Sequence, residues 1–287
     1  MRYGYAWQRW DKKRIEVGGG RQLPQTSSMY LLPPTSILKH YKIVMRKNFI
    51  FSAKTDVGRK RKLNEDAFCA AEDIGLFLVA DGMGGHAAGE IASQTAVEVV
   101  RMSLTDWLKK GPPNSEVFAR AIQLANKAVF EMAAKGSGMK GMGTTIAGIL
   151  ICNGSLVAAN VGDSRVYRIR NNNIEQLSTD HSVVGMQLSM GLITEEEAKK
   201  SAYKNVITRA IGIKGAVEVD TQDENIMKDD FMLACSDGLT SLVEDSDILN
   251  IVKQCGGNLD RACEELIGLA NFNGGDDNIT VVLVKFI

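Results

Sequence analysis

The sequence lacks three features that would each assign it to a class of proteins. No apolar run approaches the roughly 18 uninterrupted residues of a membrane-spanning helix. The only apolar candidate for a secretory signal is interrupted by Pro33 and Pro34. The five cysteines include no CxxC pair and lie mostly in apolar or helical patterns, so we expect reduced structural thiols, not disulfides or a zinc site. The sequence therefore predicts a cytoplasmic protein with no membrane partner.

Net charge is absent overall but unevenly distributed. The chain has 34 Lys and Arg and 34 Asp and Glu, yet residues 1–46 carry a net charge of +7 and the remainder −7. The first segment also holds three of the five prolines, a run of three glycines and no sustained hydrophobic period. We interpret 1–46 as a disordered basic tail, or as a mis-assigned start with Met45 as the true first residue, and expect no nucleic-acid partner. Residues 47–287 would then form one domain.

From residue 47 the hydrophobic pattern predicts strands interrupted by helices. Amphipathic helices are expected at about 89–109 and 115–135, and Thr194 with Glu197 has the spacing of a capping box for a shorter one. Strands are expected at 48–55, 66–71, 75–80, 144–152, 155–161, 164–170, 174–177, 217–226, 230–236 and 279–286, with a last helix at about 258–270. The Asn-Gly pair at 153–154 is a strong hairpin signal, so antiparallel pairing is predicted. The expected fold class is α+β, with sheets covered by helices.

Acidic residues recur beside glycine or asparagine at five places, which are Asn64-Glu65-Asp66, Asp81-Gly82, Gly162-Asp163, Asp237-Gly238 and Asp276-Asp277-Asn278. Asp81 and Asp237 each end a strongly apolar run that is typical of a buried strand. Burying a carboxylate is costly unless a cation pairs with it, and too few Lys or Arg residues lie nearby in the sequence. Mg²⁺ and Mn²⁺ take carboxylate, carbonyl and water oxygens, and a glycine after an aspartate lets the backbone turn toward the same ion. These clusters therefore predict a divalent-metal site.

Residues 82–87 also match the dinucleotide-binding pattern GxGxxA between a strand and a helix. Asp81, immediately before the first glycine, would place a negative charge beside the pyrophosphate. The acidic residue expected at the end of a second strand is missing, because Glu98 has the spacing but lies within an expected helix. A dinucleotide-binding oxidoreductase therefore remains only a distant alternative.

Taken in order, the motifs resemble the metal-dependent serine/threonine protein phosphatases of the PP2C (PPM) type, bacterial branch. The resemblance covers about residues 48–287, and its motifs are Thr55–Asp66, Asp81–Glu90, Gly143-Thr144-Thr145, Asn160–Arg165, Asp180-His181-Ser182, Asn205–Gly212, Ser236–Leu239 and Gly275–Asn278. It implies a four-layer α-β-β-α sandwich of two antiparallel sheets. It also implies hydrolysis of phosphoserine and phosphothreonine on proteins, opposing a serine/threonine kinase, by a chain that we expect to be a monomer.

The same resemblance implies a two-metal centre that uses Mn²⁺ or Mg²⁺. Asp81 would bridge the two ions, with the Gly82 carbonyl on one and Asp237 and Asp277 on the other, while Asp66 would act mainly through metal-bound water. A water between the ions would then attack phosphorus in line, without a phosphoenzyme.

The resemblance also implies roles for three further residues, and at a fourth position the sequence departs from some members of the family. Asp163 corresponds to a ligand of a weaker third metal, and Ser241 stands where some eukaryotic members have a carboxylate. Arg61 corresponds to the phosphate-binding arginine, whose planar guanidinium suits bidentate contact with phosphate. His86 is the sequence candidate for the general acid, since imidazole titrates near neutral pH; its alternative role is to orient the following helix.

Residues 180–209 correspond to the mobile flap beside the family's active site. The usual His-Pro near the end of the flap is replaced by Ser201-Ala202, and the loss of proline predicts a looser segment. His181 is expected to fix the base of this loop. Two alternatives within the fold remain, a regulatory phosphatase with one dedicated partner and a catalytically inactive binding module. The retained acidic residues argue against the inactive module, because mutually repelling carboxylates serve no purpose without a ligand.

Overall fold

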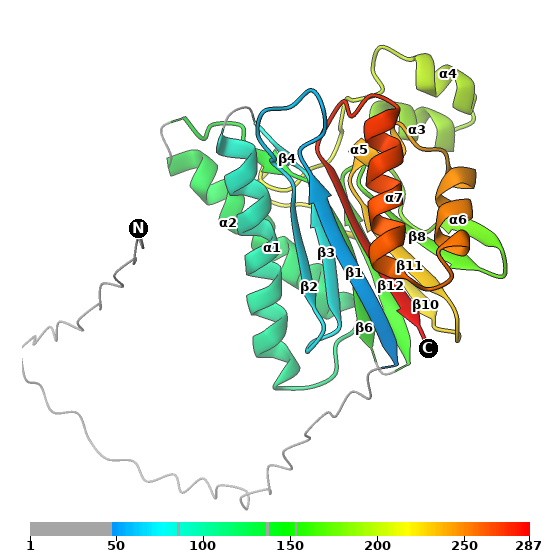
Figure 1. The fold of residues 1–287 in the computed structure, drawn as a ribbon. Helices are drawn as coiled ribbons and strands as arrows, with labels where there is room; N and C mark the ends of the chain where they lie inside the picture. Colours follow the sequence, from blue (N-terminus) through cyan, green and yellow to red (C-terminus); the bar gives the residue numbers. More distant parts are fainter. Residues whose placement is uncertain (1–47, 85–86, 136–137, 153) are drawn as a thin grey trace, which may run out of the picture. The chain divides into compact units, whose positions relative to one another are not determined.

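The structure is a computed structural model that describes residues 48–287 except 85–86, 136–137 and 153. Within this part of the chain, two antiparallel sheets are stacked between two layers of helices (Figure 1). The first sheet has the order β1-β12-β11-β8-β9, with strands β1 (Phe49–Asp56), β12 (Ile279–Phe286), β11 (Phe231–Cys235), β8 (Arg165–Arg170) and β9 (Asn173–Gln176). The second has the order β10-β7-β6-β3-β2, with strands β10 (Asp220–Asn225), β7 (Ser155–Val161), β6 (Ile146–Cys152), β3 (Leu76–Ala80) and β2 (Ala67–Ala71). The predicted fold class is confirmed.

Apolar residues that alternate along the strands hold the two sheets together. Phe77 and Val79 of β3 and Val282 and Val284 of β12 are fully buried in the core between the sheets. Phe49 packs its ring edge-on against Phe77, with the ring centroids 5.7 Å apart. Side chains of alternate residues lie on opposite faces of a strand, so β3 and β12 also supply residues to the cores beneath their own helix layers.

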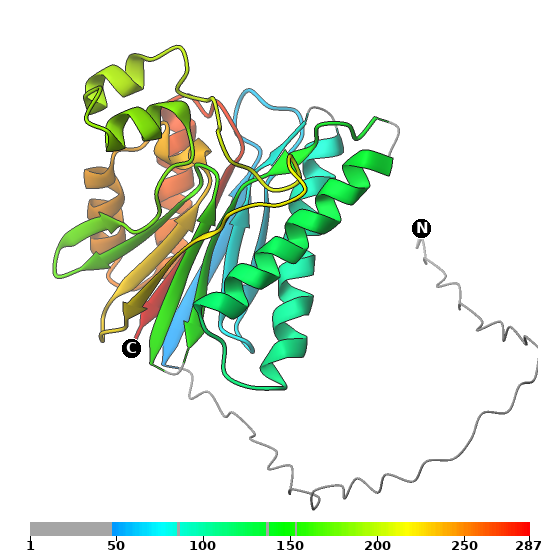
Figure 2. The same cartoon turned by 180° about the vertical axis from the view of Figure 1, so that it is seen from behind.

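A pair of helices covers the outer face of each sheet. Helices α1 (Ala87–Leu108) and α2 (Ser115–Lys135) pack on the second sheet, whereas α6 (Asp245–Gln254) and α7 (Leu259–Phe272) pack on the first. The stripe that begins at Ala92 and continues through Ala96, Val100 and Leu104 is fully buried, as its helical spacing predicts. Figures 1 and 2 show two short helices, α3 (Val183–Ser189) and α4 (Glu195–Lys200), projecting at one end of the sandwich.

The strand and long-helix predictions agree with the structure to within a few residues, but four elements were missed. They are α3, α6, the one-turn helix α5 (Asp237–Thr240) and the strand β4 (Gly82–Met83). The expected strand 144–152 is also divided, because Thr145 separates β5 (Gly143–Thr144) from β6. Thr145 exchanges hydrogen bonds with the backbone of Asp81, which turns the chain away from the ladder at this point.

All five cysteines are free and buried, as expected for structural thiols. Burial raises the pKa of the Cys69 and Cys152 thiols to about 11 and that of Cys235 to about 12, so these thiols stay protonated at neutral pH. Among the described helices, none combines the length and apolarity needed to cross a bilayer.

Candidate metal centre

Five of the aspartates singled out in the sequence come from strand ends at the same end of the sandwich. In the second sheet, Ala67 of β2 pairs with Ala80 of β3, so Asp66 and Asp81 lie across from each other just beyond the ladder. Val161 of β7 pairs with Ile146 of β6, which brings the loop carrying Asp163 to the same end.

The first sheet supplies the remaining two aspartates. Cys235 of β11 pairs with Val281 of β12, so Asp237 follows one strand where Asp277 precedes its neighbour. Strand pairing thus brings together Asp237 and Asp277, whereas Asp66, more than 200 positions before Asp277, is brought near them by the stacking of the two sheets.

Asp66 joins the two sheets through hydroxyl groups. Its Oδ2 atom accepts hydrogen bonds from Ser236 Oγ at 2.8 Å and from Thr280 Oγ1 at 2.6 Å, and both hydroxyls belong to the opposite sheet. Asn278 extends this link by accepting the Glu65 N–H at 2.7 Å and donating to the Leu63 carbonyl at 2.9 Å. Ser236 and Asn278 lie within the sequence motifs and Thr280 lies outside them, but none of the three had a predicted role, because hydroxyl and amide side chains carry no distinctive spacing.

Two glycines allow the backbones around the acidic residues to approach closely. A Cβ atom at position 82 would lie 2.2 Å from the Gly89 carbonyl oxygen, and one at position 238 would lie 2.0 Å from the Asn278 carbonyl oxygen. Both distances are far inside van der Waals contact, so only glycine fits at either place. The Asp-Gly pairs therefore reflect close packing around the carboxylates.

The carboxylates strongly perturb one another in the absence of a cation. Burial raises the pKa of Asp66 to about 7, despite the two hydroxyl donors that lower it. Burial, followed by the charges of Asp237 and Asp180, raises the pKa of Asp163 to about 7. Burial and then the charges of Asp66 and Asp237 hold the pKa of Asp81 well above its usual range, and burial with the charge of Asp277 raises that of Asp237. The protein alone does not neutralise this cluster.

Unpaired carboxylate oxygens show that the residues suit a divalent cation. Asp66 Oδ1 and Asp237 Oδ1 are buried and have no hydrogen-bond partner among the described residues. Among residues 48–287 outside the gaps at 85–86, 136–137 and 153, no three His, Cys, Asp or Glu side chains meet in a ready-made ligand set. Mg²⁺ and Mn²⁺ do not need such a set, because they are bound by one or two carboxylates together with carbonyl and water oxygens. The site fits hard cations that keep part of their hydration shell.

Arg61 lies at the rim of the centre. Its Nη2 atom is 2.6 Å from Asp277 Oδ2, while its side chain remains half exposed. The adjacent Lys60 pairs instead with Asp276, at 2.8 Å, which points that acid away from the centre. Arg61 thus combines a fixed anchor at the centre with guanidinium atoms that face solvent. His86, the sequence candidate for a general acid, lies outside the described residues.

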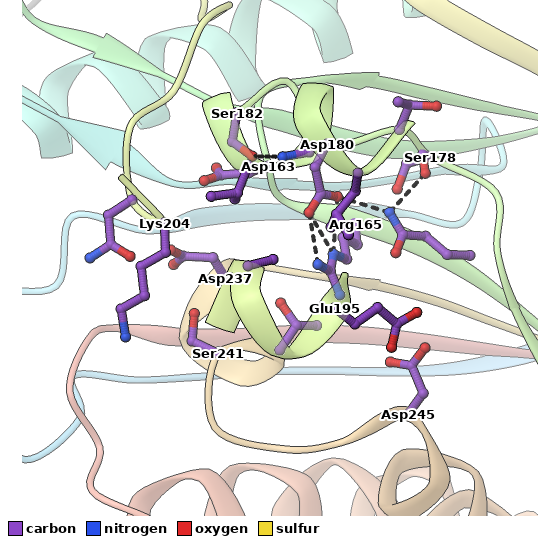
Figure 3. Close-up of a pocket in the computed structure, with 18 of the residues that line it drawn as sticks. Asp163, Arg165, Ser178, Asp180, Ser182, Glu195, Lys204, Asp237, Ser241 and Asp245 are labelled. Atoms are coloured by element: carbon purple, nitrogen blue, oxygen red, sulfur yellow. Dashed lines mark hydrogen bonds and ion pairs between the residues drawn. The ribbon is translucent and has the colours of Figure 1, made fainter. Parts of the chain in front are cut away.

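A cavity of about 520 Å³ adjoins the centre and extends beneath the flap (Figure 3). Asp163 and Asp237 line it on one side, and Val184, Leu188 and Ala198 of the flap helices line it on another. Its charged lining also includes Arg165, Asp180, Glu195, Lys204, Glu244 and Asp245. Figure 3 shows Asp180 bonded to Arg165, whose guanidinium contacts both carboxylate oxygens at 2.7–3.1 Å.

Comparison with known proteins decides the family. The sequence model described as protein phosphatase 2C matches residues 58–264, and these residues include the clusters at Asp66, Asp81, Asp163 and Asp237. The chain belongs to the protein phosphatase 2C family. It is 39% identical over 237 residues to the serine/threonine phosphatase stp of Listeria welshimeri, with 81% of this chain and 94% of that relative covered. It is 36% identical over 238 residues to the protein phosphatase PhpP of Streptococcus pneumoniae, with 82% and 96% covered.

Solved structures of this phosphatase family share the fold. The serine/threonine phosphatase PstP/Ppp of Mycobacterium tuberculosis superposes with a TM-score of 0.75 at 32% identity, covering 83% of this chain and 98% of that one. The catalytic domain of PstP in complex with two manganese ions superposes with a TM-score of 0.74 at 32% identity, with the same coverage. The dinucleotide-binding alternative is wrong. Residues 82–87 follow strand β3, which lies in an antiparallel sheet, whereas the dinucleotide-binding fold is built on a mostly parallel sheet.

Proposed function

We propose that this phosphatase hydrolyses phosphoserine and phosphothreonine on proteins with the help of two Mn²⁺ or Mg²⁺ ions held by the aspartate cluster. The observation that carries the proposal is the meeting of strand-end carboxylates from both sheets, two of which have buried oxygens without a hydrogen-bond partner among the described residues. The protein phosphatases stp and PhpP among the relatives, and the manganese-bound PstP structure, support it.

Five residues would hold the two ions. As the family resemblance implies, Asp81 would contribute to both ions, together with the Gly82 carbonyl, Asp237 and Asp277. Asp66, fixed by two hydroxyl donors, would contribute mainly by orienting water. Two bound cations supply Lewis acidity and a water of lowered pKa at neutral pH. The Asp163 side chain, buried at the cavity wall, would serve a weaker third ion.

Arg61 would orient the phosphoryl group. Its pairing with Asp277 holds one side of the guanidinium, and the exposed side is free to donate two parallel hydrogen bonds to phosphate oxygens. Asp277 would in this way be shared between a cation and the arginine, which fixes the phosphate relative to the metal centre. His86 stays a proposal for the proton donor to the leaving seryl or threonyl oxygen.

The segment of substrate next to the phosphoresidue would lie in the cavity under the flap. The cavity opens from Asp163 and Asp237 and is large enough for a few side chains. We further propose that the catalytic domain spans 47–287 and that the chain works as a monomer in the cytoplasm against a serine/threonine kinase. The free buried cysteines support a reducing compartment.

Phosphate release by the full chain tests the proposed function. Phosphopeptides and a chromogenic phosphate ester would be incubated with Mn²⁺, with excess EDTA, and with Mn²⁺ and the variant Asp237→Asn. We expect turnover only with Mn²⁺ and a loss of about 10³-fold in the variant, as for the removal of a group that stabilises transition-state charge. Turnover that survives EDTA would refute the metal mechanism. No turnover on any phosphoprotein would instead favour the inactive binding module.

A further inference from the structure

The loop that carries Asp163 is held on both sides by a single residue, His181. The backbone N–H of His181 donates to the Gly162 carbonyl at 2.9 Å, and the Gly162 N–H donates back to His181 Nδ1 at 3.0 Å. His181 therefore contacts both backbone polar groups of Gly162, whose carbonyl also accepts a longer hydrogen bond of 3.5 Å from Asn160 Nδ2. Asp163 is the next residue in the chain, so this pair of bonds fixes the peptide from which its carboxylate projects.

The loop cannot be braced by a side chain at position 162 itself. Gly162 has φ of +108°, and a Cβ atom there would lie 2.6 Å from the Cγ2 atom of Thr145. The position requires glycine, and a buried N–H without an acceptor is costly. An acceptor from elsewhere in the fold must hold this amide, and the His181 ring supplies it.

The hydrogen bonds around the His181 ring determine which ring nitrogen is protonated and which accepts a hydrogen bond. His181 is 6% exposed, and its Nε2 atom lies 3.1 Å from Asp220 Oδ2 and 3.0 Å from Arg209 Nη1. The Gly162 N–H is always a donor, so Nδ1 carries the lone pair and Nε2 carries the proton, which it donates to Asp220. Arg209 then has Asp220 as its acceptor, through Oδ1. Burial lowers the pKa of His181, which agrees with a neutral ring.

The same residue ties the flap to this loop. His181 stands at the start of the flap, and its carbonyl accepts the N–H of Thr208 at the far end of the flap, at 2.7 Å. Ser182 and Ile207 form an isolated β-bridge beside it. The two ends of the flap thus close on one residue, whose ring reaches the Gly162 amide.

We propose that His181 is a positioning residue: its Nδ1 atom holds the Gly162–Asp163 peptide, and through it sets the affinity of the third cation site at Asp163. This inference rests on the proposed function and assigns His181 more than the closing of the flap base. It concerns the ring alone, because the backbone bond from His181 N–H to Gly162 is retained whichever side chain is present.

Two amide substitutions separate the two nitrogens of the ring. In His181→Asn the amide oxygen occupies the place of Nδ1, so it can still accept the Gly162 N–H but does not reach Asp220. In His181→Gln the terminal amide occupies the place of Nε2, so the contact with Asp220 is kept and the acceptor for Gly162 is lost. Packing is disturbed in both, which makes them matched controls for each other.

Binding of Mn²⁺ to the protein without substrate, followed by electron paramagnetic resonance, gives a readout that does not depend on turnover. The Asp163→Asn variant should lose the weakest class of bound Mn²⁺, and this loss assigns that class to the site at Asp163. We expect His181→Gln to weaken that class about tenfold, as is typical when a residue that orients a ligand is removed, while His181→Asn stays near the wild-type affinity. Hydrogen exchange at the Gly162 amide should accelerate in His181→Gln and remain slow in His181→Asn.

Three results would overturn the inference. The first is a folded His181→Gln variant with wild-type Mn²⁺ binding, and the second is equal weakening in both amide variants. The third is an Asp163→Asn variant that loses no class of Mn²⁺, which would refute this inference without affecting the Asp237→Asn test of the proposed function. If His181→Gln does not fold, His181→Ala, which also lacks the acceptor, is compared with His181→Asn in the same way.

Discussion

The metal centre and the flap border the same cavity but are built in opposite ways. At the centre, Asp66 and Asp163 are buried, and backbones pass so closely that two positions admit only glycine. In the flap, helix α3 has no buried residue, and apolar side chains face solvent: Met190 is 64% exposed and Leu192 is 68% exposed.

This difference separates the part that performs chemistry from the part that meets the substrate protein. Ligands for cations must be held within a fraction of an ångström, which packed strand ends achieve. A segment with few buried contacts opens at low free-energy cost, and exposed apolar residues on such a segment are available to a partner. We therefore expect substitutions at the centre to affect stability and turnover together, and substitutions of the exposed apolar residues of the flap to affect only the use of protein substrates.

The largest effect is expected from Gly238→Ala. The new Cβ atom would lie 2.0 Å from the Asn278 carbonyl oxygen, so the backbones at positions 238 and 278 must move apart. The neighbouring Asp237 and Asp277 would then be displaced from each other. We expect the free energy of unfolding to fall by about 2–3 kcal/mol, as for an overpacked core, with loss of most Mn²⁺-dependent turnover. Urea denaturation and phosphate release measure the two effects.

Gly268→Ala is the matched control for that substitution. Gly268 lies in α7, away from the centre, and a Cβ atom there would meet nothing within 4 Å. Alanine should raise stability by up to about 1 kcal/mol through helix propensity and leave turnover unchanged. Equal behaviour of the two variants would show that the glycine at 238 is not required by packing.

The contrast also explains what the sequence could predict. Strands such as 279–286 and the stripe from Ala92 to Leu104 follow hydrophobic periods, which are local, and both were placed correctly. The family motifs named the acidic residues. The partners of Asp66 were not foreseen, because the contact of Thr280 with Asp66 spans 214 positions and depends on the stacking of two sheets.

The helices that were missed have physical reasons of their own. Helix α3 buries no residue, so its sequence has no amphipathic pattern to detect. Helix α5 is a single turn that begins at Asp237. It follows the apolar strand β11 directly and is too short to have a hydrophobic period of its own. Helix α6 does carry an apolar stripe, with Ile248 and Val252 buried and Leu249 and Ile251 partly buried, but it is only 10 residues long.

An effect on stability alone is expected from pH in the metal-free protein. Unfolded aspartates titrate near 3.9, whereas Asp66 and Asp163 have a pKa of about 7 in the fold. Between these values the folded state binds more protons than the unfolded state, so the free energy of unfolding falls as pH rises. Each group contributes at most about 1.4 kcal/mol per pH unit. Urea denaturation in EDTA from pH 4 to pH 8 should show this decline.

Two comparisons isolate the source of that decline. Asp163→Asn should flatten the slope, and saturating Mn²⁺ should abolish it, because a bound cation favours the ionised carboxylates. In the flap the expected pH dependence of stability has the opposite sign. Hydrogen bonds from Thr194 lower the pKa of Glu197, so the stabilisation from this carboxylate is present at neutral pH and is lost as pH falls. A slope unchanged by both Asp163→Asn and Mn²⁺ would place its origin outside the metal centre.

The smallest effect on stability is expected from Met190→Ser combined with Leu192→Ser. Both side chains are mostly exposed, so the free energy of unfolding should change by less than about 0.5 kcal/mol. Loss of both apolar contacts should raise KM for a phosphoprotein about 30-fold, because each of the two side chains is worth roughly 1 kcal/mol when buried at an interface. KM for a small chromogenic phosphate ester, which does not reach the flap, should stay the same.

Met102→Ser provides the control, because Met102 is 58% exposed on α1, outside the residues that line the cavity. It should leave both KM values unchanged. If the flap variant raises KM for the small ester as strongly as for the phosphoprotein, the flap acts on the metal centre and does not recognise protein.

Limited proteolysis adds an independent measure of flap rigidity. A loosely packed flap without the usual proline should be cut first around 201–205. Full protection there would remove the basis for treating the two regions as different in rigidity.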